Sequence, residues 1–447
     1  MKKNDLKRLI VLLATAALVI AALALTGCKN GTDGNGDLAP TAVPTEAPEV
    51  FTIPTDYELG AWTQKAWEGS VVYWEPVTFV TDINGEMPEL TLMYKPTQIL
   101  EVRMADGFER IEEGRDYQYD WQTNTFSLGK TITLTEGRDY TVSESGKITL
   151  KYSKQLLQVT TWESLHPKYK ENQAHDWLQM PDDHSRYFNL HNTLYKSRIY
   201  VTYVHQDDWG DSYVPKSELS KLPRMKKMLI DKQDLNFVIY GDSIATGADG
   251  TGPDELVIDV SNGNEISYKG NSAPHTPSWA EMTVQTLRQR YGYDNVFKIN
   301  RAAGASESVW GKNNADKLVN PKKPDVVVIA FGMNESGRSA AEHKGYINSI
   351  IDEIHAKNPD CEFILMSSME PNPELGHTNL SDFEKAYYEI QTERTDLHIA
   401  VCPVNSVFWA VINRGKLFTD ISSSNFNHPN DFLIRLYAMT LITTLGM

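Results

Sequence analysis

One serine of this chain stands directly at the end of an apolar run. Residues 236–244 read NFVIYGDSI, which places Ser243 where a buried strand would end. Ligands of open parallel sheets bind beyond the carboxyl ends of the strands, and a serine hydroxyl there attacks a carbonyl carbon when a neighbouring imidazole takes its proton. Taken alone, Asp242 and Ser243 are equally well interpreted as the cap of a following helix. The serine by itself therefore leaves two interpretations open.

Three later segments favour the chemical interpretation. Residues 300–304 (NRAAG) and 332–335 (GMNE) each follow a further apolar run, and His428 stands before a proline near the C-terminus. Together with residues 241–243 (GDS), these segments resemble, in order, the four blocks of the SGNH/GDSL hydrolases, over about half of the chain. The resemblance implies a serine esterase in which Ser243 is the nucleophile and His428 is its base.

The same resemblance implies an oxyanion hole. In the family the donors are the backbone N–H of the nucleophile, the N–H of the glycine in the second block and the amide of the asparagine in the third, which here are Ser243, Gly304 and Asn334. Glycine allows a close approach of substrate to backbone because it has no Cβ, and asparagine donates without carrying charge. Further candidates for shaping the leaving-group or sugar site are Glu335, Trp310 and His275.

The segment around His428 departs from the family in one respect. The family places an aspartate three residues before the histidine, where its carboxylate orients the ring, and this chain has Asn425 there. In serine proteases an Asp-to-Asn change in the triad costs about 10⁴ in kcat. Three hypotheses follow: a Ser-His dyad, whose Nδ1 proton is held by a backbone carbonyl or by Asn425; a carboxylate displaced to Asp420 or Asp431; or an inactive enzyme. We favour the dyad, because the segment resembles that of SGNH esterases that act on carbohydrates without the acid.

The elements that must position these residues alternate in type after residue 230. Strand-like apolar runs follow amphipathic stretches in turn, and this alternation predicts a parallel sheet with helices on both faces. We therefore expect residues 230–447 to form an SGNH-type, flavodoxin-like, three-layer α/β domain. Residues 51–222 are rich in Val, Ile, Thr, Tyr and Trp between turn signals, which predicts a β-sandwich accessory domain. Its tryptophans, Trp62, Trp74 and Trp209 among them, are expected to fill a core rather than to bind sugar.

The N-terminus carries the pattern of an exported protein. Basic residues precede an apolar run, and the run ends in Leu-Thr-Gly before Cys28, which resembles the lipobox of bacterial lipoproteins. Residues 1–27 are therefore expected to be a signal peptide, Cys28 to be acylated, and residues 28–50 to be a flexible tether. An uncleaved transmembrane anchor is the alternative. Both interpretations place the remaining chain outside the cytoplasmic membrane, facing away from the cytoplasm.

Composition limits the partners and cofactors that we expect. The formal net charge of -16 argues against a nucleic-acid surface, which needs clustered Lys and Arg. Cys361 and Cys402 lie in apolar stretches and are expected to be buried free thiols. The 11 histidines show no paired ligand spacing, so no metal is expected, and the implied reaction needs no cofactor.

The expected function is that of a surface-anchored esterase. We expect it to hydrolyse short-chain esters, above all acetyl esters, on a polysaccharide or oligosaccharide, while a lipid on Cys28 holds it at the membrane. Because a fold does not determine its substrate, two alternatives remain. One is a catalytically inactive glycan-binding lipoprotein, and the other is an esterase or lipase that acts on longer acyl esters.

Overall fold

The computed structural model describes most of the chain after residue 56. The described residues are 57–106, 108, 110–111, 117–128, 140–142, 148–150, 157–168, 179–189, 193–253, 255–268, 270–335, 337–376 and 380–447. The predicted signal peptide, Cys28 and the tether lie outside these ranges. Among the residues that the structure describes, none of the helices combines the length and the apolar character that crossing a bilayer requires.

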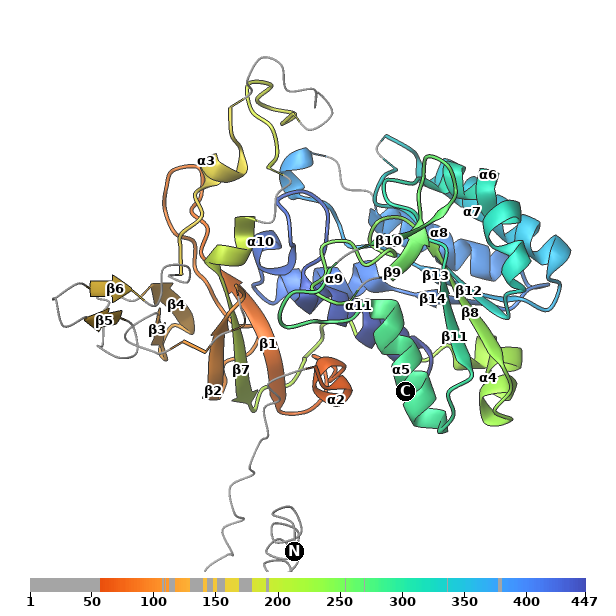
Figure 1. The fold of residues 1–447 in the computed structure, drawn as a ribbon, viewed down its shortest axis with the longest axis horizontal. Helices are drawn as coiled ribbons and strands as arrows, with labels where there is room; N and C mark the ends of the chain where they lie inside the picture. Colours follow the sequence, from red (N-terminus) through yellow and green to blue (C-terminus); the bar gives the residue numbers. More distant parts are fainter. Residues whose placement is uncertain are drawn as a thin grey trace, which may run out of the picture. The chain divides into compact units, whose positions relative to one another are not determined.

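A five-stranded parallel sheet forms the centre of the C-terminal half, in the order β11-β8-β12-β13-β14 (Figure 1). Its strands are β8 (Leu235–Gly241), β11 (Val296–Asn300), β12 (Val326–Ala330), β13 (Glu362–Met366) and β14 (Ile399–Cys402). The strands are nearly continuous apolar runs, as is usual for parallel strands covered on both faces. Numbered by their place in the chain, they follow the flavodoxin-like order 2-1-3-4-5, in which the connections reverse direction beside the first strand and leave a crevice there.

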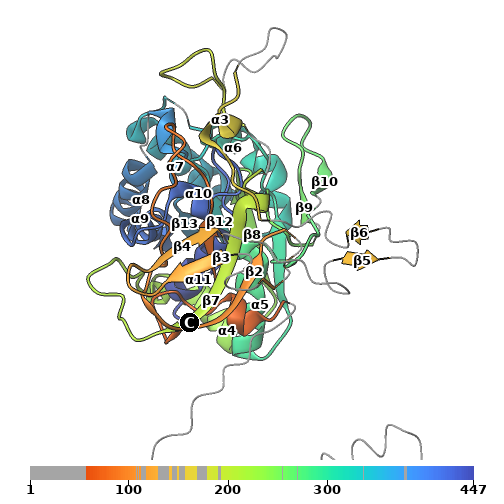
Figure 2. The same ribbon diagram turned by 90° about the vertical axis from the view of Figure 1, so that its left-hand side faces the viewer.

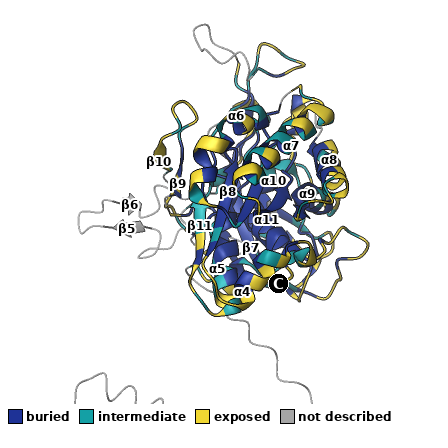
Figure 3. Cartoon of the chain, turned by 90° about the vertical axis from the view of Figure 1, so that its right-hand side faces the viewer, coloured by how far each residue is buried: buried dark blue, intermediate teal, exposed yellow. Residues whose placement is uncertain are grey.

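Two apolar clusters cover the two faces of this sheet, because alternate residues of each strand point to opposite sides. Phe237 and Ile239 of β8 join the cluster that includes α4 (Pro223–Ile230), α5 (Trp279–Tyr291), α9 (Val404–Asn413) and α11 (Asp431–Thr444). Val238 and Tyr240 join the cluster on the other face, with α6 (Ser308–Leu318), α7 (Ala340–Lys357) and α8 (Leu380–Glu393). The buried sheet between the two helical layers is visible in Figure 3. The predicted parallel α/β sheet is therefore confirmed.

The N-terminal region is rich in β-strands, as predicted, but its described strands do not confirm a β-sandwich. Its central sheet is antiparallel and has three strands in the order β1-β7-β2. These are β1 (Val71–Thr78), β7 (Arg198–His205) and β2 (Pro96–Met104). Two hairpins form separate sheets, β3 (Tyr117–Asp120) with β4 (Thr125–Leu128), and β5 (Tyr140–Val142) with β6 (Ile148–Leu150). Tyr117, Tyr119 and Phe126 of the first hairpin belong to the same apolar cluster as the three-stranded sheet.

The C-terminal half covers part of the three-stranded sheet. Strand β1 is buried along nearly its whole length, and it contacts α10 (Phe418–Ile421) and α11 of the C-terminal half. Apolar residues from both halves, including Trp62, Trp74 and Phe432, belong to one continuous core cluster. The sheet therefore buries part of its surface against the α/β layer (Figure 2).

The remaining elements are short. They are α2 (Leu59–Trp62), α3 (Trp162–Leu165), the hairpin strands β9 (Glu255–Ile258) and β10 (Glu265–Tyr268), and the 3-10 helices Thr193–Ser197, Leu219–Lys221, Asn320–Lys322 and Pro373–Leu375. Trp62, Trp74 and Trp209 are buried, as expected for core residues. Cys361 and Cys402 are buried and free, which confirms the expectation for both thiols.

Candidate active site

The end of β8 brings together a serine, a histidine and an aspartate. The Ser243 hydroxyl lies 2.8 Å from Nε2 of His428, and Nδ1 of the same ring lies 2.9 Å from Oδ2 of Asp249. The side chains of His428 and Asp249 retain about a quarter of their surface in contact with solvent, at 22% and 28%. The arrangement is that of a nucleophile, a base and a carboxylate that orients the base.

The turn after β8 is held by a buried carboxylate. Asp242 accepts hydrogen bonds from the backbone N–H of Ile244 at 3.0 Å and of Met333 at 3.2 Å, so it joins the nucleophile turn to the end of β12. Burial raises the pKa of Asp242 to about 6, although these hydrogen bonds act in the opposite direction. The side chain is directed into the fold and braces the turn, while Ser243 faces the cavity.

Asp249 reaches His428 because the same turn bends sharply back. Its backbone adopts the left-handed conformation, with φ of 62°, a region that Asp tolerates better than most non-glycine residues. A second donor, the Ser423 hydroxyl, lies 2.9 Å from the same carboxylate oxygen as the histidine. Burial acts to raise the pKa of Asp249, but the hydrogen bond and charge of His428, with Ser423, outweigh it and lower that pKa. The carboxylate is therefore ionised at neutral pH.

The three residues whose N–H groups are expected to form an oxyanion hole lie around one cavity. Among the described residues, the backbone N–H groups of Ser243 and Gly304 donate to no other group. The Asn334 amide nitrogen donates one hydrogen to the carbonyl of Ser306 at 3.0 Å, which fixes its orientation and leaves its second hydrogen available. All three residues line the same cavity as His428. A Cβ at Gly304 would meet nothing within 4 Å, so open space lies above this backbone.

The three residues predicted to orient His428 lie elsewhere. Asn425 contacts Nε2 of His166 at 2.9 Å and accepts from the Asn372 amide at 3.1 Å, so it docks its loop onto neighbouring segments. Asp420 accepts from the Thr78 backbone N–H at 2.7 Å. The carboxylate that lies beside Nδ1 of His428 is instead Asp249, at 2.9 Å, which none of the three hypotheses included.

Asp431 is also engaged away from the histidine. It accepts from the backbone N–H of Thr251 at 3.0 Å and from its hydroxyl at 2.8 Å, and burial raises its pKa to about 6. The cap of α11 is Asn430, whose side chain accepts from the Phe432 and Leu433 amides. Asp431 therefore joins the start of α11 to the loop that follows the nucleophile turn.

Hydrogen bonds and an ion pair with the N-terminal region hold the segment that leads to His428. Arg198 of β7 is fully buried and donates to the Thr419 carbonyl at 2.9 Å and to the Ser422 carbonyl. Lys416 is buried as well, and its Nζ donates to the Thr91 carbonyl at 2.9 Å and pairs with Glu75 of β1 at 3.1 Å. The position of His428 therefore depends on residues more than 200 positions away in the sequence.

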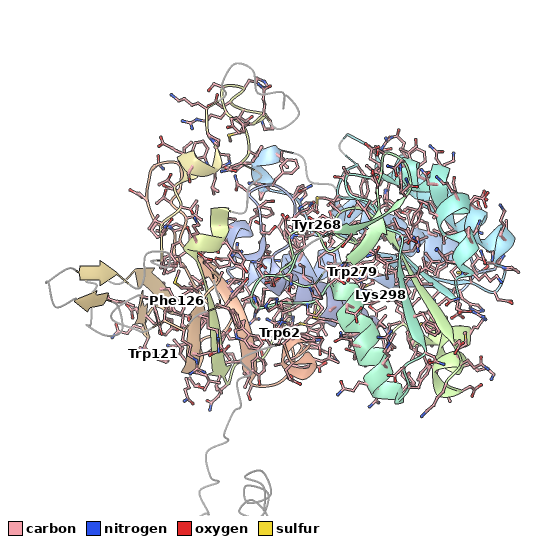
Figure 4. All side chains as sticks on the ribbon, viewed as in Figure 1. Trp62, Trp121, Phe126, Tyr268, Trp279 and Lys298 are labelled. Atoms are coloured by element: carbon pink, nitrogen blue, oxygen red, sulfur yellow. The ribbon has the colours of Figure 1, made fainter. Side chains whose placement is uncertain are left out.

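A cavity of about 480 Å³ opens over Ser243. The β9–β10 hairpin forms one wall with Ile266 and Tyr268, and Phe426 contributes to another; Figure 4 labels Tyr268 on this hairpin. The hairpin is held in place by an ion pair of Arg301 with Glu265, with a closest distance of 2.5 Å, and its turn accepts a hydrogen bond from Trp310 Nε1 at the Val260 carbonyl.

The three further candidates do not line this cavity. Glu335 accepts from the Ser308 backbone N–H and approaches Arg338, so it holds the start of α6. Trp310 acts only through its support of the hairpin, and His275 is exposed outside the cavity. Within the ranges that the structure describes, no cluster of His, Cys, Asp and Glu could hold a metal ion.

The comparisons agree with this architecture at the level of the domain. Residues 239–432 match the model of the GDSL-like Lipase/Acylhydrolase family, so this segment carries a hydrolase domain of the GDSL type. No curated protein matches the chain.

The solved structures that are similar to this chain share little sequence with it. A two-domain esterase active on acetylated mannans is 15% identical over 53% of this chain and 56% of its own, with a TM-score of 0.38. A catalytic mutant of an acetylxylan esterase from Geobacillus stearothermophilus is 15% identical over 48% and 94%, with a TM-score of 0.37. An α/β hydrolase from the metagenome of Lake Arreo, Spain, is 16% identical over 47% and 95%, with a TM-score of 0.36.

Proposed function

Because residues 239–432 carry a hydrolase domain of the GDSL type, we propose that the chain is a serine esterase that removes acetyl groups from carbohydrate. One observation carries the catalytic part of this proposal: the hydrogen-bonded series Ser243, His428 and Asp249, which opens into a cavity. Its geometry supplies each group that acyl transfer to a serine needs.

The proposed reaction has two halves. Nε2 of His428 takes the proton of Ser243 as Oγ bonds to the ester carbonyl carbon, and the N–H groups of Ser243, Gly304 and Asn334 stabilise the resulting oxyanion. The oxyanion then collapses, the bond to the sugar oxygen breaks, and the histidine gives its proton to that oxygen. A water molecule, deprotonated by His428, then attacks the acyl-enzyme. The bond between the acyl carbon and Ser243 Oγ breaks, the histidine returns the proton to Oγ, and acetate leaves. Asp249 stabilises the imidazolium that forms in both halves.

The lining of the cavity supports a short acyl group on a polar alcohol. Apolar contacts from Ile266 and Phe426 alternate with polar groups, among them Asp259 and Asn427. An extended alkyl chain would cover these polar groups without hydrogen-bonding them, at a cost of about 1–3 kcal/mol for each buried group. Sugar hydroxyls would satisfy them instead. The volume of about 480 Å³ is also that of a small-molecule site.

The central experiment compares wild type with Ser243→Ala on p-nitrophenyl acetate and on a panel of acetylated polysaccharides. Wild type should release acetate from at least one polysaccharide, and Ser243→Ala should release none above background. Equal and negligible rates for both proteins on every substrate would overturn the proposal. A rate that rises from p-nitrophenyl acetate to the octanoate would favour an esterase for longer acyl chains.

The main argument for an inactive glycan-binding protein was the absence of the usual acid. It rested on Asn425 at the position of the usual acid. Since Asp249 lies 2.9 Å from the histidine Nδ1, a carboxylate is present for this role.

We further propose that the esterase is exported and attached to the outer side of the cytoplasmic membrane by a lipid on Cys28. The support is the sequence pattern of residues 1–28 alone. Expression with radioactive palmitate should label the wild-type chain and leave Cys28→Ser unlabelled, with the variant released from the membrane fraction. Equal labelling of both chains would contradict the assignment of Cys28.

A further inference from the structure

A second cavity lies at the β14 edge of the sheet, between α8 and α9. Its volume is about 400 Å³, and residues 211–213 of the N-terminal half close its outer side. Helices α8 and α9 lie side by side in Figures 2 and 3, and they contact each other. None of the residues assigned to ester hydrolysis lines this cavity.

Exposed aromatic side chains gather in this cavity. The large aromatic side chains that are exposed in the described part of the chain are Trp121, Tyr213, Phe297, Tyr388 and Trp409. Three of these five, Tyr213, Tyr388 and Trp409, line the second cavity, with exposed fractions of 37–38%. Exposed apolar surface that is gathered in a concave site marks a binding surface, whereas singly scattered residues do not. The clustering therefore points to a ligand with flat apolar faces.

The floor of the cavity is rigid. Glu384 of α8 is 6% exposed and accepts hydrogen bonds from the Ser367 hydroxyl at 2.6 Å and from the Ser406 backbone N–H at 3.1 Å. These bonds join α8 to β13 and to the start of α9. A site that is already ordered loses little entropy when a ligand binds.

Polar groups surround the rings. Asp211, Lys385 and Asn413 line the same cavity, so an anionic acceptor, a cationic donor and an amide stand beside the aromatic surface. A pyranose ring matches this combination, because its axial C–H groups form an apolar face and its hydroxyl groups both donate and accept at the rim. A purely apolar ligand would leave the polar groups without partners, at a cost for each group.

The cavity also lies on the side of the sheet that holds the active site. Helix α9 begins directly after β14, and Ser406 near its start lines the cavity, so the cavity begins at the carboxyl edge where Ser243 follows β8. The order β8-β12-β13-β14 separates the two strands by three steps of about 4.8 Å, or about 14 Å. A polymer of several sugar units can extend over that distance.

We propose that this second cavity binds pyranose rings in the backbone of the polysaccharide whose ester groups are removed at Ser243. The choice of a glycan as the ligand rests on the proposed function, while the existence of a ligand site rests on the cavity itself. The sugar rings stack on Trp409 and Tyr388, and the rim side chains bind their hydroxyl groups. The site raises the local concentration of esterified chain at the catalytic serine.

Binding is measured without turnover in the full chain carrying Ser243→Ala. Xylohexaose, mannohexaose and chitohexaose are titrated calorimetrically into this protein and into the same protein with Trp409→Ala or Tyr388→Ala. The matched control is Trp121→Ala, because Trp121 is 45% exposed on the turn between β3 and β4, away from both cavities (Figure 4). In chains that retain Ser243, hydrolysis of p-nitrophenyl acetate shows that each variant is folded.

At least one hexasaccharide should bind, and Trp409→Ala and Tyr388→Ala should each raise its Kd about tenfold, which corresponds to about 1.4 kcal/mol and to one well-stacked aromatic contact. Trp121→Ala should change the Kd less than twofold. On the esterified polymer the two cavity variants should raise KM and leave kcat unchanged. Binding of none of the three hexasaccharides, or equal Kd values in the cavity variants and the control, would overturn the second site. Failure of the proposed esterase would show separately, as an unchanged rate for Ser243→Ala on p-nitrophenyl acetate.

Discussion

Replacing Asp249 with asparagine should lower kcat for p-nitrophenyl acetate by about 10²–10³ in a protein that remains folded. The carboxylate oxygen lies 2.9 Å from Nδ1 of His428, so the negative charge is about 4 Å from the centre of the imidazolium that forms in the transition state. At an effective dielectric constant of 20, two charges at about 4 Å attract by about 4 kcal/mol. This energy corresponds to about 10³ in rate. The 28% exposure of Asp249 admits water that screens the pair, which sets the lower limit of the range.

The second contact of Asp249 explains why the loss should stay below the 10⁴ known for serine proteases. The Ser423 hydroxyl donates to the same oxygen as the histidine. In the asparagine variant this hydroxyl favours the orientation in which the amide oxygen, rather than the NH₂ group, faces Nδ1. His428 then keeps its proton on Nδ1 and can still accept the Ser243 proton at Nε2. Only the charge is lost, and not the tautomer.

The assay is steady-state hydrolysis at pH 7.5, with the unfolding midpoint of each variant measured in parallel. Asn425→Ala is the control, because Asn425 stands at the position of the usual acid but contacts His166 and Asn372. It should retain kcat within a few-fold. If Asp249→Asn keeps more than a third of the wild-type kcat, or if Asn425→Ala loses as much as Asp249→Asn in an equally stable protein, the assignment of Asp249 is wrong.

Three further predictions test the surroundings of this site. Asn334→Ala should lower kcat by about 10²–10³ with little change in KM, because it removes one oxyanion donor; an unchanged kcat on p-nitrophenyl acetate would exclude the role. Lys416→Met should lower the free energy of unfolding by about 3–5 kcal/mol in urea titrations, because it leaves Glu75 as a buried unpaired charge, and adding Glu75→Gln should restore part of the loss. Burial raises the pKa of Asp431 from its ordinary value of 3.8 to about 6 in the folded protein. The folded chain therefore binds more protons than the unfolded chain between about pH 4 and 6, and its stability falls as the pH rises through this window. Asp431→Asn should reduce that fall in pH-dependent urea titrations, and an identical slope would contradict the shifted pKa.

The α/β half of the fold was predictable because its strands carry a strong local signal. A run such as residues 236–240 is apolar on both faces, and only a sheet covered on both sides accepts such a run. In the N-terminal half the structure confirms strands among the described residues, but it does not confirm the predicted sandwich. Alternating strand sequences show that one face is buried, but they do not show what covers it. Here the cover comes from α10 and α11, which lie more than 200 residues later in the chain.

The candidate site was also predictable only in part. Ser243, Gly304, Asn334 and His428 follow strand ends or a terminal segment, and the structure brings all four to one cavity. Asp249 has no such signal, because its approach to His428 depends on a left-handed backbone in a turn rather than on a strand or helix period. The one available clue was its place in Asp249-Gly250, a turn dipeptide only six residues after the nucleophile. A search for the acid therefore needs to include both the segment before the histidine and the turn after the serine.

The N-terminal region helps to hold the segments that carry the candidate site. Beyond its contacts with the His428 loop, it binds the fully buried guanidinium of Arg435 on α11 through the carbonyl groups of Trp62 at 2.9 Å and Tyr73 at 2.8 Å. An arginine in that position requires its partners, because an unpaired buried charge is strongly destabilising. The α/β layer therefore reaches its native packing only with the three-stranded sheet in place. Arg198 and Arg435, which connect the two halves, lie on either side of the segment that presents His428, so the same contacts that stabilise the fold also determine where the base stands.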